Sequence, residues 1–148
     1  MHEQEKELLE TLITHAYELL ARRPQSEFEI RYKLKRFGYK RNIKDCQLYI
    51  NQVVELLRDE DYVNDRTFAK WYTDQRQQFK PRSKRQIQME LIKKGIEREI
   101  LAETLEQYNE ELACRTLAIQ KRHMEKKKLR EYLLRQGFGW DMVEQILY

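Results

Sequence analysis

Glycine and proline are scarce in this sequence, with four and two residues among 148. Average proteins use about 7% glycine and 5% proline, so the chain has about a third of the usual number of residues that interrupt regular structure. This scarcity argues against loop-rich β-sandwiches and against disordered linkers. Charged residues make up 36% and hydrophobic residues 41%, a balance typical of exposed helices with one apolar face. The composition predicts an all-α protein.

Long apolar runs and cysteine motifs are also lacking. No segment approaches the roughly 20 apolar residues that span a membrane, and the N-terminus has no basic region followed by an apolar run, which is how secretion signals begin. The two cysteines, Cys46 and Cys114, match no CxxC or zinc-ligand spacing. We therefore expect a cytoplasmic chain with buried, inert thiols, no cofactor and no membrane partner.

Motifs for catalysis are absent as well. No HExxH, GxSxG, P-loop or GxGxxG pattern occurs, and the three histidines have no zinc-ligand spacing. The densest carboxylate group, Asp59-Glu60-Asp61 with Asp65, has the residue types that hold Mg2+ in nucleases. A turn in which Asn64 or Asp65 caps the next helix explains these residues more simply. We therefore expect no enzyme, and a metal-dependent nuclease is the enzymatic alternative.

The few glycines and prolines recur at fixed positions of an internal repeat. Gly38, Gly95 and Gly137 each follow apolar residues four and eight positions earlier, and Pro24 and Pro81 stand 14 residues before the first two. Each proline ends a helix, and a serine two residues later can cap the next one. This second helix is expected to run about ten residues and to stop where its glycine takes the left-handed conformation.

Side chains around these glycines support the same register. Ser26 with Glu29 and Ser83 with Gln86 have the spacing of capping boxes. An apolar contact across each glycine stop is also expected. Its three pairs are Leu34 with Tyr39, Leu91 with Ile96 and Leu133 with Phe138.

The register predicts three tandem three-helix repeats. Their expected bounds are 1–60, 61–108 and 109–148, with the third repeat degenerate at its start. The first helix of each repeat is expected at about 3–22, 65–79 and 109–123, and the third helix near Asn42, Glu99 or Asp141. Because a ten-residue helix is marginal in water, the repeats must pack on their neighbours, and we expect an elongated, curved helical array.

Basic residues are concentrated in the same part of each repeat. Residues 20–44, 76–94 and 115–135 hold 24 of the 29 Lys and Arg residues but only 5 of the 25 acidic residues. Stacked repeats would bring these windows together as a basic surface. Solubility alone would explain one such cluster, whereas recurrence in three repeats favours binding to a polyanion or to an acidic protein groove.

We expect basic residues of these windows to make the partner or DNA contacts. The candidates are Arg22, Arg23, Arg31, Lys35, Arg76, Lys80, Arg82, Lys84, Arg85, Arg122, Lys126, Lys127 and Arg130. Arg23, Lys80 and Arg122 each stand 15 residues before a repeat glycine, so they are candidates for equivalent contacts. Four aromatic residues lie among these basic residues and could stack on nucleobases, but their helical spacing favours a place in the core. They are Tyr32, Tyr39, Phe79 and Tyr132.

Two blocks of the sequence match the pattern of a known family. The central block is Asp61-Tyr62-Val63-Asn64-Asp65-Arg66-Thr67-Phe68-Ala69, then Arg76, then Ile87-x2-Glu90-Leu91-x2-Lys94-Gly95-Ile96. The N-terminal block is Ala16-x2-Leu19-Leu20-Ala21-Arg22-Arg23-x2-Ser26-Glu27-x2-Ile30-x3-Leu34. Together they resemble the RecX regulatory proteins, and the resemblance extends from about residue 13 to the end.

The resemblance implies tandem three-helix repeats, in agreement with the period. It also implies a non-catalytic regulator of homologous recombination that binds RecA filaments and inhibits filament growth, ATP hydrolysis and strand exchange. We therefore expect the RecA filament as partner, with single-stranded or duplex DNA as a further partner through electrostatics. The alternative is a tandem helix-turn-helix-like protein that acts directly on DNA, because the second helix, glycine turn and third helix resemble that motif.

Overall fold

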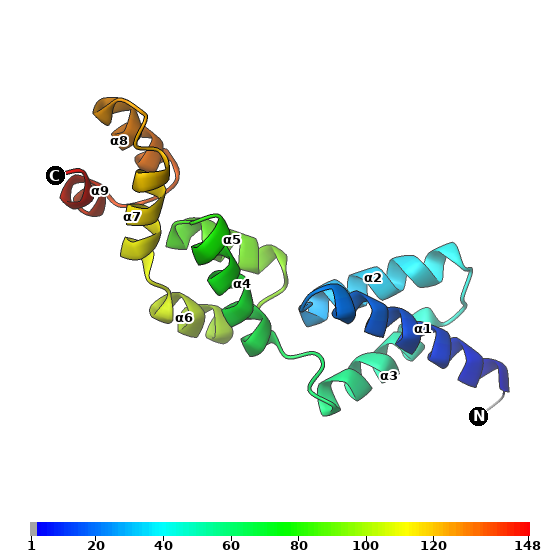
Figure 1. Cartoon of the computed structure of the whole chain (residues 1–148). Helices are drawn as coiled ribbons and strands as arrows, with labels where there is room; N and C mark the ends of the chain where they lie inside the picture. The colour runs from blue at the N-terminus through cyan, green and yellow to red at the C-terminus, as the bar shows by residue number, and fades with distance from the viewer. Residues whose placement is uncertain (1–2) are drawn as a thin grey trace. The chain divides into compact units, whose positions relative to one another are not determined.

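The computed structural model describes residues 3–148, and the regular structure in that range is entirely α-helical (Figure 1). The helices are α1 (Glu3–Arg22), α2 (Glu27–Lys40), α3 (Cys46–Asp59), α4 (Asp65–Phe79), α5 (Lys84–Lys93), α6 (Arg98–Gln107), α7 (Glu110–Gln120), α8 (Lys126–Arg135) and α9 (Trp140–Leu147). They follow one another as three sets of three, which confirms the predicted all-α class with three helices per repeat. The bounds of the repeats and the curved form of the array stay predictions.

The second helices of the first two repeats, α2 and α5, begin with the predicted capping boxes. The Glu29 N–H donates to Ser26 Oγ at 3.1 Å, and the Glu29 carboxylate accepts the Ser26 N–H at 3.0 Å. In the next repeat the Gln86 N–H donates to Ser83 Oγ at 3.2 Å, and the Gln86 side chain accepts the Ser83 N–H at 3.1 Å. Each box satisfies two backbone donors that the first turn of a helix leaves without partners.

The first glycine does not end its helix, contrary to the prediction. α2 continues through Gly38 to Lys40 and has 14 residues, whereas α5 and α8 have 10. Gly38 lies against Cys46, where an added Cβ would collide with the sulfur atom. The left-handed residues of this loop are Asn42 and Asp45 instead. As a result, α3 begins four residues later than expected.

The other two glycines end their helices as predicted. Gly95 and Gly137 have φ angles of 78° and 104°, a conformation that costs glycine little. Ile96 and Phe138, which follow them, are buried, whereas Tyr39 at the equivalent position of the first repeat is 83% exposed. The apolar contact expected at Tyr39 is therefore wrong, because the helix does not stop before it.

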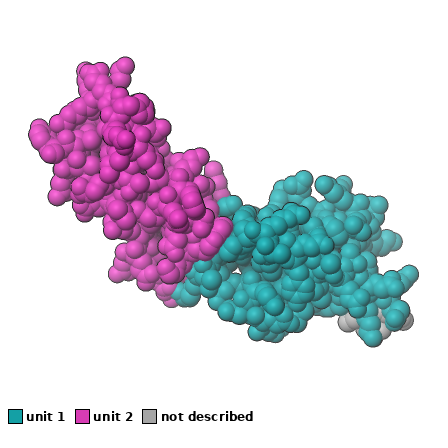
Figure 2. All heavy atoms as spheres, in the orientation of Figure 1, with its two compact units in different colours: residues 1–68, 94–96 teal, residues 69–93, 97–148 magenta. Residues whose placement is uncertain are grey.

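The chain forms two compact units, which Figure 2 shows in different colours. Among the described residues, the first comprises 3–68 together with 94–96, and the second comprises 69–93 and 97–148. The turn around Gly95 thus belongs to the first unit, although the helices on either side of it belong to the second. None of the helices in the described part of the chain has the length and apolar character of a membrane span.

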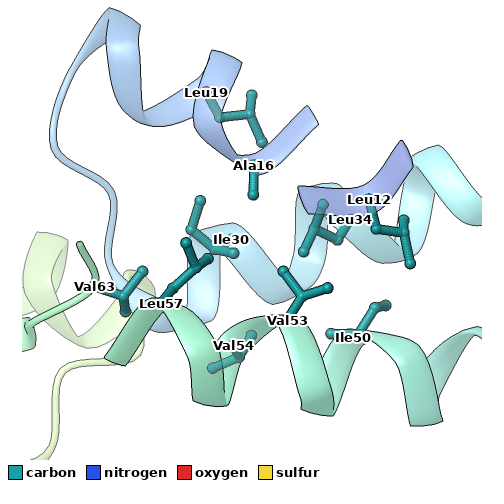
Figure 3. Close-up of a cluster of buried hydrophobic side chains, with 10 residues drawn as sticks. All are labelled: Leu12, Ala16, Leu19, Ile30, Leu34, Ile50, Val53, Val54, Leu57 and Val63. Atoms are coloured by element: carbon teal, nitrogen blue, oxygen red, sulfur yellow. The ribbon is translucent and has the colours of Figure 1, made fainter. Parts of the chain in front are cut away.

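The core of the first unit lies where α1, α2 and α3 meet (Figure 3). Apolar side chains from the three helices and the following turn point toward one another. They are Leu12, Ala16, Leu19, Ile30, Leu34, Ile50, Val53, Val54, Leu57 and Val63. Fully burying one Leu, Ile or Val contributes roughly 1.5 to 3 kcal/mol, so this cluster fixes which side of α2 faces inward and which side carries its basic residues outward.

The N-terminus of α2 makes two contacts with distant parts of the first unit. Ser26 Oγ donates to the carbonyl oxygen of Lys94 at 2.8 Å, immediately before Gly95. The Glu27 N–H donates to the Asp65 carboxylate at 2.9 Å. The cap serine and the first helical N–H of α2 are therefore both tied to segments of the second repeat.

The N-terminus of α5 makes the same two contacts within the second unit. Ser83 Oγ donates to the carbonyl oxygen of Gln136 at 2.7 Å, immediately before Gly137. The Lys84 N–H donates to the Glu110 carboxylate at 2.7 Å. This repetition indicates that serine, glycine and an acid at the start of the next repeat form one recurrent junction.

Candidate partner-binding surface

The second helix of each repeat is basic and the third is acidic. α2, α5 and α8 together contain 13 basic and 4 acidic residues, whereas α3, α6 and α9 contain 2 basic and 7 acidic residues. In helix-turn-helix proteins the helix after the turn enters the major groove. Because phosphates repel acidic side chains, this distribution does not favour duplex reading by the third helices.

Five of the thirteen predicted contact residues form ion pairs within the chain. Arg23, Arg31, Arg76, Arg82 and Arg130 pair with Glu29, Glu27, Glu90, Glu90 and Glu144, respectively. A carboxylate beside a guanidinium cancels most of its field at longer range. These five residues therefore contribute less to attracting a polyanion than their charge in the sequence suggests.

Glu29 is the most enclosed of these carboxylates, with 7% of its surface exposed. Its oxygens accept hydrogen bonds from Arg23 at 2.7 Å, Lys94 at 2.9 Å and the Ser26 N–H at 3.0 Å. Burial alone would raise the pKa of Glu29, but these bonds outweigh it and lower that pKa to about 2. Arg23 thus neutralises a buried charge instead of presenting its own charge to a partner.

Glu90 holds a second group of polar side chains, in the second unit. It accepts a hydrogen bond from the Tyr72 hydroxyl at 2.6 Å and pairs with Arg76 at 2.8 Å and Arg82 at 3.7 Å. The Arg76 guanidinium also lies 5.1 Å from the centre of the Tyr72 ring. Burial and the bond to Glu90 raise the pKa of Tyr72. Arg76 and Arg82 are therefore bound to the body of the unit.

Eight predicted contact residues form no ion pair within the described chain, and we call them the unpaired basic set. They are Arg22, Lys35, Lys80, Lys84, Arg85, Arg122, Lys126 and Lys127. Lys84 is half-buried and the other seven are exposed. The Arg122 guanidinium donates to the carbonyl oxygen of Ile119 at 3.2 Å, and the Lys126 ammonium lies 4.7 Å from the centre of the Tyr148 ring. Their charges are available to a partner.

The three residues expected to make equivalent contacts differ in their surroundings. Lys80 and Arg122 are exposed, whereas Arg23 forms part of the Glu29 group. Sharing a repeat position therefore does not give these side chains the same role. Arg22, the exposed neighbour of Arg23, is the better counterpart of Lys80 and Arg122.

The prediction that the four aromatic residues among the basic residues lie in the core is wrong for three of them. Tyr32, Tyr39 and Phe79 are 53, 83 and 69% exposed. Tyr132 is half-buried, with the Lys121 ammonium 5.7 Å from its ring centre. Helical spacing did not distinguish an inward from an outward face here, because the core of the first unit uses Ile30 and Leu34 on the other side of α2.

One side of α2 brings exposed rings and basic side chains together, and we call it the α2 face. Its members are Phe28, Tyr32, Lys35, Arg36, Tyr39 and Lys40. The last five line a shallow hollow of about 480 Å³. Of these six residues, only Lys35 is among the thirteen predicted contact residues. The signal for the others was the i, i+4, i+11 spacing of Phe28, Tyr32 and Tyr39 between basic residues.

The carboxylates considered for a metal site turn to separate partners. Asp61 accepts from the Asn64 side chain at 3.0 Å, Asp65 accepts from Glu27, and Glu60 accepts from the Tyr17 hydroxyl. Asn64 Oδ1 accepts two N–H groups of the first turn of α4, so the predicted cap at Asn64 is confirmed. Within residues 3–148, no three His, Cys, Asp or Glu side chains gather as metal ligands do.

The two thiols differ in burial. Cys114 is fully buried, and burial raises its pKa to about 11. Cys46 is half-buried at the end of the first repeat's loop, and burial raises its pKa as well. Because the thiolate is the reactive form, both groups are poor nucleophiles near neutral pH. The expectation of buried thiols is thus confirmed for Cys114.

Comparison with known proteins identifies relatives along most of the chain. Residues 64–105 match the family model described as RecX, second three-helix domain. A regulatory protein RecX of Caldanaerobacter subterraneus is 32% identical, over 90% of this chain and 67% of that protein. Another from Chlorobium phaeobacteroides is 30% identical, over 89% of this chain and 88% of that protein.

Solved structures of the same kind share the fold. The crystal structure of RecX from Lactobacillus salivarius superposes with a TM-score of 0.73 at 22% identity, over 96% of each chain. A second crystal structure of a regulatory protein RecX gives a TM-score of 0.74 at 18% identity, over 97% of this chain and 73% of that one. At these identities the likeness establishes the arrangement of helices.

Proposed function

Because this chain belongs to the RecX family of regulatory proteins, we propose that it binds RecA filaments and restrains their growth, ATP hydrolysis and strand exchange. It acts by binding and carries out no reaction of its own. The observation that carries the proposal is the membership of the family together with the unpaired basic set. This set offers positive charge without internal neutralisation, which suits a filament that contains DNA phosphates and acidic protein surface.

The charge of the helices supports this proposal over direct reading of duplex DNA. The unpaired basic set lies on the second helices and the segments that lead into them, and the third helices are acidic. A protein that inserted its third helices into the major groove would need the opposite distribution. We therefore expect weak duplex binding near physiological salt, where each phosphate contact is partly screened.

The experiment that tests the proposal reverses charge at three members of the unpaired basic set. The variant combines Arg22→Glu, Lys80→Glu and Arg122→Glu, one exposed residue near the start of each second helix. We expect it to fold normally and to lose most inhibition of RecA ATPase, with at least a tenfold higher concentration needed for half inhibition. Arg23 is left intact because its removal would strand the buried Glu29.

A matched control reverses three exposed basic residues outside the basic windows. Lys6, Lys70 and Arg98 are exposed, and changing all three to Glu gives the same change in net charge. We expect this control to inhibit RecA ATPase as the unmodified chain does. If both variants lost inhibition equally, net charge alone would govern binding; if neither did, the unpaired basic set would not contact the filament.

A further inference from the structure

The α2 face combines exposed rings with cations that form no ion pair in the described part of the chain. Its three rings are, in chain order, 52, 53 and 83% exposed. Lys35, Arg36 and Lys40 lie between and beside them, and none of the three forms an ion pair within the described residues. The two acids of α2, Glu27 and Glu29, do not oppose this charge, since each carboxylate already binds two basic side chains. The face is therefore both aromatic and positive.

The three rings of the α2 face differ in what lies against them, and the Phe28 side chain packs against Gly95. The rings of Phe28 and Tyr32 lie nearly parallel, with an interplanar angle of 11° and their centres 6.4 Å apart. The Arg36 guanidinium lies 5.8 Å from the centre of the Tyr32 ring. Tyr39 has no ring contact among the described residues and is the most exposed of the three. Exposed aromatic surface is unfavourable in water, so a ligand with flat apolar faces would gain by covering it.

The equivalent faces of the other second helices expose no ring at the positions of Tyr32 and Tyr39, because Phe138, at the position of Tyr39, is buried. At the position of Tyr32, α5 has Met89 and α8 has Glu131. At the position of Lys35 they have Ile92 and Leu134. Met89 and Ile92 are each 54% exposed, so α5 presents an aliphatic surface of the same geometry. The rings of α2 are thus a property of this helix and not of the repeat.

Exposed rings between cations favour single-stranded over duplex nucleic acid. The base pairs of a duplex hide their flat faces inside the stack, so a duplex offers a protein only base edges and phosphates. The bases of a single strand offer their flat faces, and proteins bind them by stacking aromatic side chains on them while basic residues follow the backbone. Cations alone serve both polyanions, whereas exposed rings add affinity only for the single strand.

We propose that the α2 face binds single-stranded nucleic acid, with unpaired bases stacked on Tyr32 and Tyr39 and with Lys35, Arg36 and Lys40 on the phosphates. From Phe28 to Tyr39 the helix rises about 16 Å, which is long enough to follow several nucleotides of a single strand. This interaction goes beyond the proposed function because it requires no RecA. It makes the face selective for unpaired bases.

The test measures affinity without RecA, by fluorescence anisotropy of a labelled oligo-dT and of a duplex of equal length. The unmodified chain is expected to bind the single strand more tightly than the duplex. The variant Tyr32→Leu with Tyr39→Leu keeps apolar side chains at both exposed positions but removes the rings. We expect it to bind the single strand about 30-fold more weakly, the lower end of the range for two stacked bases, and to bind the duplex unchanged.

Two control variants isolate the role of the rings. Tyr32→Phe with Tyr39→Phe keeps both rings and is expected to retain single-strand affinity. Met89→Ala with Ile92→Ala changes the equivalent face of α5 and is expected to do the same. The inference is overturned if the Leu variant binds the single strand as tightly as the unmodified chain, if the Phe variant is as weak as the Leu variant, or if the unmodified chain shows no preference for the single strand.

The salt dependence tests the phosphate contacts separately. Lys35→Gln with Arg36→Gln should lower the slope of log affinity against log salt by about 1.4 for the single strand, since each contact contributes about 0.7. An unchanged slope would remove these two side chains from the interface. Circular dichroism of each variant checks that the helices are intact.

Assays of RecA ATPase with the Leu variant separate this inference from the proposed function. Weaker single-strand binding with normal inhibition supports the inference and leaves the proposed function standing. Lost inhibition with normal single-strand affinity assigns the rings to a protein contact and overturns the inference. Failure of the unmodified chain to inhibit RecA, with single-strand selectivity intact, overturns only the proposed function.

Discussion

Glu29 is a buried carboxylate that determines which neighbouring basic residues are available to a partner. The capping box at Ser26 and Glu29 could be predicted from their spacing, and the structure contains it. The two cations around Glu29 could not be predicted, because Lys94 is 65 residues away along the chain. The candidate site changes accordingly, since Arg23 belongs to a buried pair and Arg22 beside it stays exposed.

The lowered pKa of Glu29 predicts a specific loss of stability in acid. Its pKa in the folded chain is about 2, below the ordinary value of 4.5, so the folded chain holds its proton less tightly than the unfolded chain. The stabilisation is therefore complete above about pH 4.5 and is lost as the pH falls toward 2. We expect Glu29→Gln to lower the free energy of unfolding by roughly 1 to 3 kcal/mol at pH 7.

Urea denaturation between pH 2 and 7 provides the measurement. The difference between Glu29→Gln and the unmodified chain should shrink as the pH falls from 4.5 toward 2. Glu55→Gln, at an exposed position of α3, serves as the control and should have little effect at any pH. A difference that stays constant across this range would contradict the assignment of the charge to Glu29.

At the scale of helices, the sequence predicts starts better than it predicts ends. Prolines and capping serines set the starts of α2 and α5 through local bonds, which a short stretch of sequence specifies. The end of α2 depends on what surrounds Gly38. Gly38 permits close contact with Cys46 from within the helix, and α2 continues past it. The spacing predicts that the glycine ends the second helix in all three repeats, whereas the packing of each repeat determines whether it does.

The junction between repeats predicts a large effect of a small substitution. Ser83 caps α5 and donates to Gln136, so Ser83→Ala removes both bonds. We expect a loss of about 2 kcal/mol in the free energy of unfolding, the sum of a lost cap and an unsatisfied carbonyl. Thermal unfolding followed by circular dichroism measures it.

Glu125 provides the matched control for Ser83. It holds the N-cap of α8 without a side-chain cap bond, so Glu125→Ala is expected to change stability by less than about 0.5 kcal/mol. Equal effects of the two alanine substitutions would show that Ser83 contributes no more than an ordinary surface residue.

For the molecule as a whole, the distribution of charge carries more information than its net value of +4. The three basic windows could be predicted from composition along the chain. The sequence does not predict which of these basic residues are neutralised, because partners such as Arg130 and Glu144 come together only when α8 packs on α9. The predicted set of thirteen therefore divides into five residues that form ion pairs within the fold and eight that form none among the described residues.

This division predicts opposite effects on stability and on polyanion binding when unpaired cations are removed and when whole ion pairs are removed. Changing Lys80, Arg85 and Lys127 to Gln should lower the salt concentration at which the chain elutes from heparin, since up to about three fewer counterions are released. Stability should be preserved. Changing Arg31, Arg76 and Arg130 to Gln together with their partners Glu27, Glu90 and Glu144 removes both charges of each pair and keeps the net charge. It should leave elution nearly unchanged and lower the free energy of unfolding by roughly 1 to 3 kcal/mol.

Heparin chromatography and urea denaturation of the same samples provide both measurements. Equal losses of heparin retention in the two variants would contradict the division, because they would show that paired and unpaired cations attract a polyanion alike.

The junction bonds also have an evolutionary consequence. Each junction joins a serine of one repeat to the carbonyl group before a glycine of the next, Ser26 to Lys94 before Gly95 and Ser83 to Gln136 before Gly137. Selection should therefore act on these pairs across repeat borders, and substitutions at both members of a pair should accumulate together. Position 125 and the turn after α2 lie outside the two junctions, so we expect them to diverge more than the junction residues. Descent from a duplicated unit would then be most visible in the middle repeat, where both halves of the junction are retained.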